Sequence, residues 1–576
     1  MIRSLIISIL FLSSAAEAKT WKVAVLYWSM RIEGQVLMRK GLEEEAHKFN
    51  STSSINNGDQ VELIPFVAGE GREGIIKQIE QFTQANKKNP DAIIIQPTDN
   101  AALAEGLQAA NRLKIPVVAY DQYIVGGNLA AFVTSNNYGG GVDGANYIDS
   151  IFPKKKSLRI VVFEYPQVSS TTERVDGFFD GLRAKQRPFV VLERYQAVEP
   201  VSGKNAALKF LKDYPKKGSV DVVFTVNDGG GLSVVKEILA KKRNEIKHAT
   251  FDGDPLSVEN IREGKLTVID SAQYCAELGR RAFREMIKVV KGGSAGIKVR
   301  VPTFPVTPES IKNYTGWMGV PVDEPKAIVR SEKSKNTGNL IFRVGATPLC
   351  PYVCEKSPGV WTGYLFEILG EIAKKQGLDL RLESIPNSRL VTALQTHKVD
   401  YIIAPQYLVR YISDIKIVGP ELGVNFTGAI LPKESQIGLI DTVSLKKLKV
   451  VYSDFGYQGD RTALGTILER ANRLTGVDVA DRMKKMMMDG RAEIALGDFN
   501  VIRNSFDSNK ETKLKLVPTS LTGFSFFVMA GSPKSPQVDF LGNRLSEWFE
   551  ASRTNGHLSE VLNKYNLSDW QILDRN

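Results

Sequence analysis

Carboxylate and amide side chains stand directly after apolar, strand-like runs in the first half of the chain. They are Gln96, Asp99, Asp121, Asn227, Asp228 and Asp252. In open α/β sheets ligands bind beyond the carboxyl ends of parallel strands, so we expect these side chains to converge on one cleft. Planar carboxylate and amide groups can each engage two adjacent hydroxyls, which is what capture of a sugar-type molecule requires.

The elements that must position these side chains alternate between two patterns. Apolar runs such as 92–96 and 116–120 alternate with amphipathic helical patterns such as 74–86. This alternation predicts parallel sheets that are covered by helices on both faces.

The strand-like opening at 21–27 returns at 340–345, and a second α/β series follows it. At roughly 150 residues per domain, 576 residues correspond to three or four lobes, so two modules of two lobes each fit the length. The predicted fold class is α/β, with two tandem Venus-flytrap modules whose mainly parallel sheets are covered by helices. The predicted divisions are an export signal (1–18), a first module (19–319), a polar linker (320–339) and a second module (340–576).

The N-terminus has the composition of an export signal. Arg3 precedes an apolar run at 5–12, and Ala16-Glu17-Ala18 has the small-x-small form of a cleavage site. The run is too short to span a bilayer, and no cysteine stands near the cleavage site for lipid attachment. We expect a secreted, soluble and non-lipidated protein of the periplasm; a retained anchor is the alternative.

Composition argues against several other functions. The formal charge is +11, but the basic residues are scattered, which favours solvated surface charge over nucleic-acid binding. The four histidines are far apart, at 47, 248, 397 and 557, so we expect no metal site and no cofactor. The glycine runs at 139–141 and 229–231 lack the spacing of a nucleotide loop and fit close backbone approach at a helix start.

The sequence also lacks a recognisable catalytic arrangement. No Gly-x-Ser-x-Gly elbow occurs, and the histidines have no evident partners, so we expect no enzyme activity. The enzymatic alternative is a glycosidase that uses Asp121 and Asp252 as converging carboxylates. A third class, a transcriptional regulator on the same sensor fold, is disfavoured by the export signal and the missing DNA-binding segment.

The first module resembles the type I, ribose-type periplasmic binding proteins. The resemblance is carried in order by 95–100, 120–121, 134–137, 173–178, 227–228, 251–253 and Gln273. It implies polar ligand contacts and one aromatic wall, which are Asp121, Asn137, Arg174, Asn227, Asp252 and Gln273, and Phe251. The family often has an aromatic pair where this chain has Gly34-Gln35, and an Arg where it has Gln122. Its aromatics are instead Tyr27-Trp28 at the strand end, so we add Trp28 to the site. These departures argue against ribose itself, and we expect a polar ligand with several hydroxyls.

The second module resembles the type II, amino-acid-type solute-binding proteins (family 3). The segments that carry the resemblance are 340–345, 347–354, 363–377, 386–390, 394–404, 490–498 and 532–565. The resemblance implies that Arg410 grips an α-carboxylate and that Asp498 accepts from an α-ammonium. The Ser/Thr donors of that family are replaced by 404–407, so a repurposed or empty pocket stays open as an alternative.

Cys350 and Cys354 are close enough in sequence to form a short disulfide in an oxidising compartment, with two free thiols as the alternative.

These observations predict a periplasmic solute-binding protein. It captures a sugar-like ligand in the first module, with an amino acid as a further ligand in the second. It passes closure on to an inner-membrane receptor such as a sensor kinase. The alternative is substrate delivery to the permease of an ABC transporter.

Overall fold

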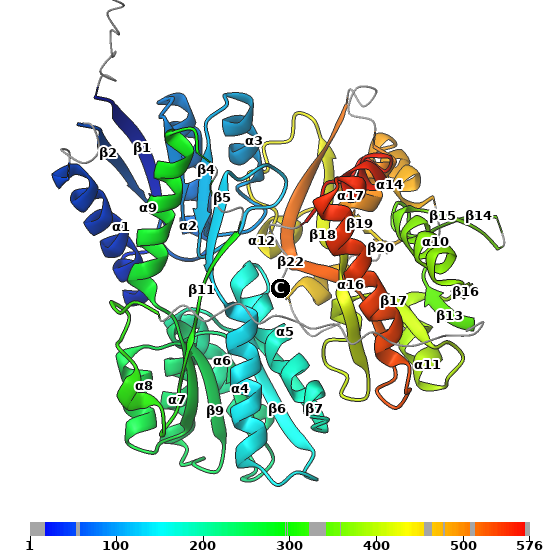
Figure 1. Cartoon of the computed structure of the whole chain (residues 1–576), viewed down its shortest axis with the longest axis horizontal. Coiled ribbons are helices and arrows are strands. Elements are labelled where there is room, and N and C mark those ends of the chain that lie inside the picture. The colour runs from blue at the N-terminus through cyan, green and yellow to red at the C-terminus, as the bar shows by residue number, and fades with distance from the viewer. Residues whose placement is uncertain are drawn as a thin grey trace, which may run out of the picture.

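The computed structural model describes residues 18–52, 58–293, 295, 298–321, 341–357, 359–453, 463–475, 478–506 and 513–570 (Figure 1). We call 18–321 the first half and 341–570 the second half. The predicted export signal and linker fall almost entirely outside the described residues. None of the helices in the described part of the chain combines the length and the apolar composition needed to span a bilayer.

The first half contains two lobes, each built on a six-stranded sheet. Lobe A has the strand order β11-β5-β4-β3-β1-β2, and all its pairings are parallel. Its strands are β1 (Thr20–Tyr27), β2 (Gln60–Val67), β3 (Ala92–Ile95), β4 (Val117–Tyr120), β5 (Ala131–Ser135) and β11 (Lys298–Val301). Helices α1 (Glu33–Ser51) and α9 (Cys275–Val290) cover one face, and α2 (Gly71–Lys87) and α3 (Ala104–Arg112) cover the other.

Lobe B has the strand order β12-β10-β9-β8-β6-β7, in which only β12 is antiparallel to its neighbour among the described strands. Its strands are β6 (Leu158–Glu164), β7 (Phe189–Gln196), β8 (Val222–Thr225), β9 (Lys247–Asp252), β10 (Thr267–Ala272) and β12 (Phe304–Val306). Its helices are α4 (Asn137–Ile151), α5 (Ser169–Ala184), α6 (Pro200–Asp213), α7 (Asp228–Ala240), α8 (Pro255–Arg262) and the 3-10 turn η1 (Ile311–Asn313). Helices α4 and α5 pack on one face, and α6 and α7 on the other.

The chain passes between the lobes after β5, after β10 and between β11 and β12. In lobe A, α1 and α9 cross so closely that a Cβ on Gly279 would lie 1.9 Å from the backbone oxygen of Met38. The parallel, doubly covered sheets predicted for this half are confirmed, since β3 and β4 are completely buried and apolar.

The second half is organised around one mixed sheet with the order β16-β13-β17-β22-β18-β21-β19-β20. Two long antiparallel strands, β18 (Lys416–Pro432) and β22 (Leu514–Gly531), form a ribbon through its middle. The other strands are β13 (Ile341–Ala346), β16 (Asp379–Ser384), β17 (Tyr401–Pro405), β19 (Val450–Tyr452), β20 (Asn472–Arg473) and β21 (Ile494–Asp498), with a separate hairpin of β14 (Cys354–Ser357) and β15 (Val360–Thr362). The prediction of mainly parallel sheets holds only in part here: β13 pairs in parallel with β16 and β17, and β19 with β20 and β21, whereas every pairing made by the ribbon strands is antiparallel.

The two ends of the ribbon carry different elements. One end pairs with β17 and is packed by α10 (Tyr364–Gln376), α11 (Asn387–Gln395), α16 (Val538–Thr554) and α17 (His557–Asn563), with the 3-10 turn η2 (Gln406–Leu408) after β17. The other end pairs with β21 and carries α12 (Thr442–Leu445), α13 (Ala463–Leu468), α14 (Val479–Met488) and α15 (Phe499–Asn504). The structure places Cys350 and Cys354 in a disulfide, with the two Cα atoms 4.8 Å apart, and this bond remains a prediction for the exported protein.

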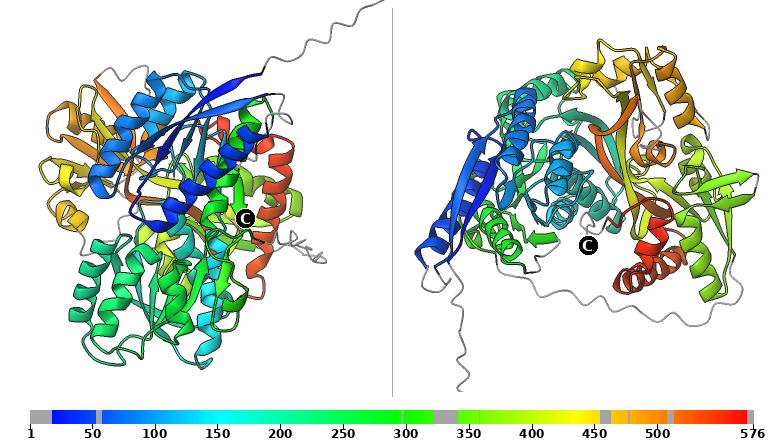
Figure 2. Two further views of the ribbon diagram at one scale, coloured as in Figure 1. Left: turned by 90° about the vertical axis from the view of Figure 1, so that its left-hand side faces the viewer. Right: turned by 90° about the horizontal axis from the view of Figure 1, so that it is seen from above.

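The second half lies beside the first and contacts both of its lobes, as the views of Figures 1 and 2 agree. Contacts to lobe A include the hydrogen bond from Ser520 Oγ to Asp99 Oδ1 (2.5 Å) and the ion pair of Arg72 with Asp441 (2.6 Å). The hydrophobic core of lobe A continues into the second half as one cluster of buried side chains. The two halves are therefore packed together in this structure.

Candidate functional site

A polar cleft lies between the lobes of the first half, where the carboxyl ends of the strands face each other. Asp121 and Asn227 follow β4 and β8, Asp252 ends β9, and Gln273 follows β10. Arg174 lies on α5, and Trp28 follows β1. Six of the eight residues predicted for this site line one cavity of about 50 Å³: Trp28, Asp121, Arg174, Asn227, Asp252 and Gln273.

Arg174 is the centre of the polar network. Its Nη1 donates to Asp252 Oδ1 (2.9 Å) and to the carbonyl oxygen of Val226 (2.7 Å). Gln273 Nε2 donates to the same carboxylate oxygen of Asp252 (2.7 Å). A guanidinium group, a carboxylate and an amide therefore share one corner of the cleft, and each keeps capacity for a further hydrogen bond.

Asn137 and Phe251 are buried and do not line the cavity, so their placement differs from the direct ligand contact that we expected. Asn137 Oδ1 accepts from Arg174 Nε (2.9 Å), and the Arg174 guanidinium lies 4.7 Å from the centre of the Phe251 ring. Both residues fix the orientation of Arg174 from behind. The resemblance correctly placed Asn137 and Phe251 near the cleft. Whether their side chains reach the cavity depends on side-chain packing, which the resemblance does not specify.

The two aspartates of the cleft have unusual backbones. Asp121 has φ +64° and Asp252 has φ +113°, the left-handed region that favours glycine. Such strain persists where the surrounding structure enforces it, and it clusters at binding sites. Burial raises the pKa of both carboxyls, and in each case the nearby Arg174 guanidinium opposes that rise.

Gln96 holds the second aspartate in place, since its Nε2 donates to Asp121 Oδ2 (3.0 Å). Asn227 begins α7: its Oδ1 accepts from the backbone nitrogen of Gly230 (3.2 Å), and its Nδ2 donates to the carbonyl oxygen of Val198 (2.9 Å). Asn227 thus acts as a helix cap while its side chain borders the cavity.

The cleft is nearly closed in this conformation. The cavity of about 50 Å³ is far smaller than the roughly 300–1,000 Å³ of small-molecule sites, so it is too small for a monosaccharide as it stands. A ligand of that size needs the lobes to separate along the crossover segments before they close around it.

Several further residues of the cavity were not predicted. They are Ile32, Gly34, Gln35, Met38, Gln122, Val168, Ser170, Thr171, Val198, Glu199 and Cys275. Gln122 Nε2 donates to Ser170 Oγ (2.7 Å), which ties lobe A to the start of α5. The sequence signal for this contact was the polar run 169–173 directly before Arg174, which forms the start of helix α5.

In the second half, the structure does not bring Arg410 and Asp498 together. Arg410 is buried against lobe B, where its Nε donates to Asp176 Oδ1 (2.5 Å). Asp498 caps α15 by accepting from the backbone nitrogen of Val501 (2.8 Å), and it also accepts from Asn425 Nδ2. Burial raises the pKa of Asp498 to about 7. The carboxylate that faces Arg410 is thus supplied by the first half of the same chain.

Other contacts surround that ion pair. Tyr411 Oη donates to Glu164 Oε2 (2.7 Å), and Arg183 Nη1 donates to the backbone oxygen of Arg410 (2.6 Å). Among the residues that the structure describes, no group of three or more His, Cys, Asp or Glu side chains is arranged to hold a metal ion.

Comparison with known proteins assigns the first half. Residues 23–294 match the family model described as periplasmic binding protein domain. The match ends at 294, so this similarity covers the first half of the chain and not the second.

Relatives of this periplasmic binding protein domain carry names of binding proteins. The ribose import binding protein RbsB of Bacillus subtilis is 26% identical over 293 residues, which are 50% of this chain and 89% of that protein. RbsB of Salmonella typhimurium is 26% identical over 229 residues, or 39% of this chain and 74% of that protein. The D-allose-binding periplasmic protein of Escherichia coli is 23% identical over 304 residues, or 51% and 92%.

Solved structures similar to this domain include an ABC transporter solute-binding protein of Actinobacillus succinogenes with bound D-allose. It has a TM-score of 0.44 and 21% identity, and the match covers 51% of this chain and 99% of that one. A solute-binding protein of Bacillus halodurans with bound myo-inositol has a TM-score of 0.45 and 19% identity, covering 52% and 98%.

Proposed function

We propose that the cleft of the first half binds an uncharged, polyhydroxylated molecule of the size of a monosaccharide. The observation that carries this proposal is the convergence of Arg174, Asp252 and Gln273 at one corner of a cavity that Trp28 also borders. Carboxylate, amide and guanidinium groups together accept from and donate to adjacent hydroxyls, and an aromatic ring offers an apolar face to a sugar ring.

Charge supports an uncharged ligand. Two carboxylates, Asp121 and Asp252, stand against one guanidinium, Arg174, in a buried site. An anionic ligand would add to this buried negative charge. A cationic ligand would compete with Arg174 for the same carboxylates. The names of the relatives, which refer to ribose and D-allose, agree with this class of ligand.

A panel of ligands tests this proposal. D-ribose, D-allose, myo-inositol and allitol are compared with gluconate and glucosamine by their effect on the thermal midpoint of the full chain. A ligand that binds only the folded state stabilises it by RT ln(1 + [L]/Kd) and so raises the midpoint as its concentration exceeds Kd. At least one neutral member should raise the midpoint, and the charged members should have less effect. If none of the neutral members shifts the midpoint, the proposal is wrong.

We propose that the second half senses whether the lobes of the first half are open or closed. Two groups of elements at opposite ends of the β18–β22 ribbon fit a second two-lobed module of the type II kind. The position of Arg410 that would receive a ligand carboxylate is taken by Asp176. The same half contacts lobe A through Ser520 and Asp99, so a movement between the lobes must alter its contacts.

In this proposal the protein resides in the periplasm, and the second half passes closure of the first on to an inner-membrane receptor such as a sensor kinase. The alternative is delivery of the ligand to an ABC permease. Photo-crosslinking in living cells separates the two: a benzoylphenylalanine at exposed positions of the second half, such as Val443 or Met488, should capture a kinase and not a permease. Capture of a permease alone would favour transport.

The same proposal predicts that free amino acids have no effect on the second half. None of the common amino acids should raise the thermal midpoint of the full chain. A clear shift with any one of them, abolished by Asp498→Ala, would instead assign a zwitterion site to this half.

A further inference from the structure

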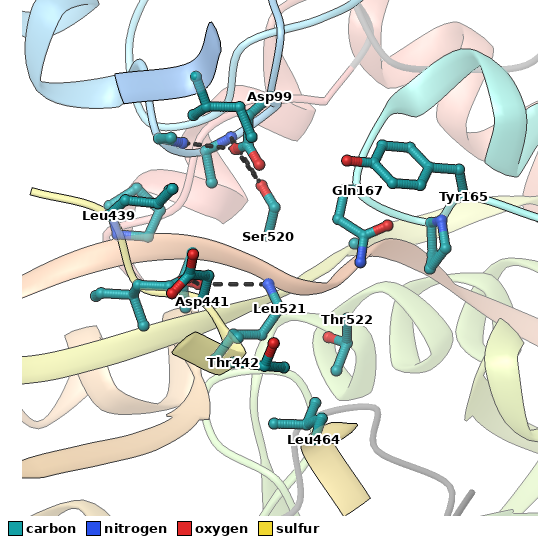
Figure 3. Close-up of a pocket in the computed structure, with 18 of the residues that line it drawn as sticks. Asp99, Tyr165, Gln167, Leu439, Asp441, Thr442, Leu464, Ser520, Leu521 and Thr522 are labelled. Atoms are coloured by element: carbon teal, nitrogen blue, oxygen red, sulfur yellow. Dashed lines mark hydrogen bonds between the residues drawn. The ribbon is translucent and has the colours of Figure 1, made fainter. Parts of the chain in front are cut away.

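A second, larger cavity lies between the two halves of the chain, separate from the cleft described above. Its volume is about 430 Å³, in the range of small-molecule sites. It shares no lining residue with the cleft of the first half. Figure 3 shows part of its wall, with Tyr165 and Gln167 on one side and Leu439 on the other.

Three parts of the structure build this cavity, which we call the inter-half cavity. Lobe A contributes residues of α2 and the segment before α3, including Ile75 and Asp99. Lobe B contributes the loop between β6 and α5, with Tyr165 and Gln167, and the end of β7. The second half contributes strand β22 and the segment around Leu439. The cavity therefore has its present shape only while both lobes and the second half keep this arrangement.

The arginines in the wall are already neutralised. Arg72 pairs with Asp441 (2.6 Å), and Arg194 pairs with Glu164 (3.1 Å). Arg410 pairs with Asp176 (2.5 Å), as described above. An anion in the cavity would have to displace a carboxylate to pair with one of these arginines. In a buried site the free energy lost by leaving that carboxylate unpaired exceeds the free energy gained from the new pair.

The buried carboxylate of the wall is satisfied too. Asp99 Oδ1 accepts from Ser520 Oγ (2.5 Å) and from the backbone nitrogens of Ala101 (2.8 Å) and Ala102 (2.7 Å). Burial raises the pKa of Asp99, which makes this carboxyl a poor partner for an added cation. The three paired arginines and Asp99 thus offer little to a charged ligand of either sign.

Neutral hydrogen-bonding capacity remains. Gln167 Oε1 and Ser525 Oγ are buried and have no partner among the described residues, and both residues line the cavity. Ser525 is only 6% exposed. A buried acceptor or hydroxyl without a partner costs about 1–3 kcal/mol, which a ligand that supplies the missing partner would recover.

The rest of the wall is apolar and aromatic. The side chains are Ile75, Ile79, Tyr165, Tyr195, Tyr407, Leu431, Leu439, Leu464, Val517 and Leu521. Leu439 and Leu464 come from different segments of the second half, and both line the cavity. Such a wall gains free energy by covering an apolar ring, at about 25 cal/mol per Å² of apolar surface.

We propose that the inter-half cavity is a second ligand site, which takes an uncharged aromatic alcohol. Its hydroxyls bond to Gln167 and Ser525, and its ring packs on the leucines. Since both lobes of the first half form its wall, its occupancy and the arrangement of the lobes are thermodynamically linked.

A series of three analogues of equal size tests the charge requirement on the full chain. Tyrosol is neutral, 4-hydroxyphenylacetate is an anion and tyramine is a cation. We expect saturable binding of tyrosol in titration calorimetry, at least tenfold tighter than binding of either charged analogue. Absence of saturable tyrosol binding, or equal affinity for all three, would overturn the proposal.

Two variants in the cavity wall, Ala102→Phe and Gln167→Leu, and one control variant locate the binding. Ala102 lines the cavity, and Ala102→Phe should fill part of it and weaken tyrosol binding at least tenfold. Ala240→Phe makes the same exchange at an exposed position of α7 and should leave the affinity unchanged. Gln167→Leu keeps the volume and removes the free acceptor, so it should weaken tyrosol binding even if Ala102→Phe fails to fold. If both Ala102→Phe and Gln167→Leu bind tyrosol as tightly as the parent chain, the site lies elsewhere. Because no residue is shared with the cleft, sugar binding by the variants separates failure of this proposal from failure of the first.

Discussion

Replacing Gly523 by alanine should loosen the contact between the two halves of the chain. Gly523 lies in β22 with φ +71°, and a Cβ at this position would stand 1.8 Å from the backbone oxygen of Pro166 in lobe B. Pro166 is backbone-anchored between β6 and α5, so it cannot move aside as the end of a flexible side chain would. The clash is therefore relieved by separating the halves.

Gly490 provides a matched control for the backbone term. It has φ +68°, and a Cβ there would meet no atom within 4 Å. Both substitutions bear the cost of a left-handed alanine, about 1–2 kcal/mol. Only Gly523→Ala adds the cost of overpacking, about 1–3 kcal/mol. The difference between the two variants thus measures the contact between the halves.

Denaturant unfolding measures the loss of stability, and small-angle X-ray scattering measures the separation of the two halves. Gly523→Ala should lower the free energy of unfolding by about 1–3 kcal/mol more than Gly490→Ala, and it should increase the radius of gyration. Equal losses of stability with unchanged scattering would refute the reasoning, because the halves would then not be packed in solution as they are here.

The remaining predictions concern the second half. In a double-mutant cycle of Arg410→Met and Asp176→Asn, each single change should cost about 3–5 kcal/mol, because each removes one partner of a buried ion pair. The double change should cost clearly less than the sum, and strict additivity would contradict the pairing. Burial raises the pKa of Asp498 to about 7 from a usual value near 3.8, so the folded state holds its proton more tightly and the free energy of unfolding should fall as pH rises from about 4 to about 7. Asp498→Asn should flatten this fall in a urea titration at several pH values, and an unchanged slope would contradict the burial argument. Cys350 and Cys354 of the exported protein should resist alkylation without reductant in mass spectrometry, whereas two alkylated thiols would show that no bond forms.

The sequence was sufficient to predict the fold of the first half because its strands are continuous apolar runs. Strands β3 and β4 are buried along their whole length, and such runs are typical of parallel sheets covered by helices. The ends of these strands could be predicted from the same runs, and they located Asp121, Asn227 and Asp252. No information on packing was needed, because a residue at the end of a strand lies at the edge of the sheet.

Which side chains line the cavity and which lie behind them could not be predicted in the same way. Phe251 directly precedes Asp252, which borders the cavity, and Asn137 begins α4, yet both residues lie behind Arg174. One residue along a strand changes the face that a side chain occupies, and the crossing of α4 and α5 decides which faces are covered.

The partner of Arg410 could not be predicted from the sequence for a different reason. Asp176 is 234 residues away, on the opposite half of the chain. Neither residue carries a local signal of the contact, because each stands in a segment whose own fold does not require it. Only the packing of the two halves brings them together, and the order of segments along the chain does not specify that packing.

The central claim, that the cleft of the first half binds a neutral polyhydroxylated molecule, is tested most directly by calorimetric titration of the full chain and two variants. The titrant is the most effective neutral member of the sugar and polyol panel. Asp252→Ala removes a carboxylate of the cleft, and Asp254→Ala removes a nearby carboxylate that caps α8 and does not line the cavity. We predict one site on the parent chain, an affinity weakened roughly tenfold to a hundredfold by Asp252→Ala, and an unchanged affinity in Asp254→Ala. Equal affinity of the parent and Asp252→Ala, or no heat of binding with any neutral member, would contradict the account.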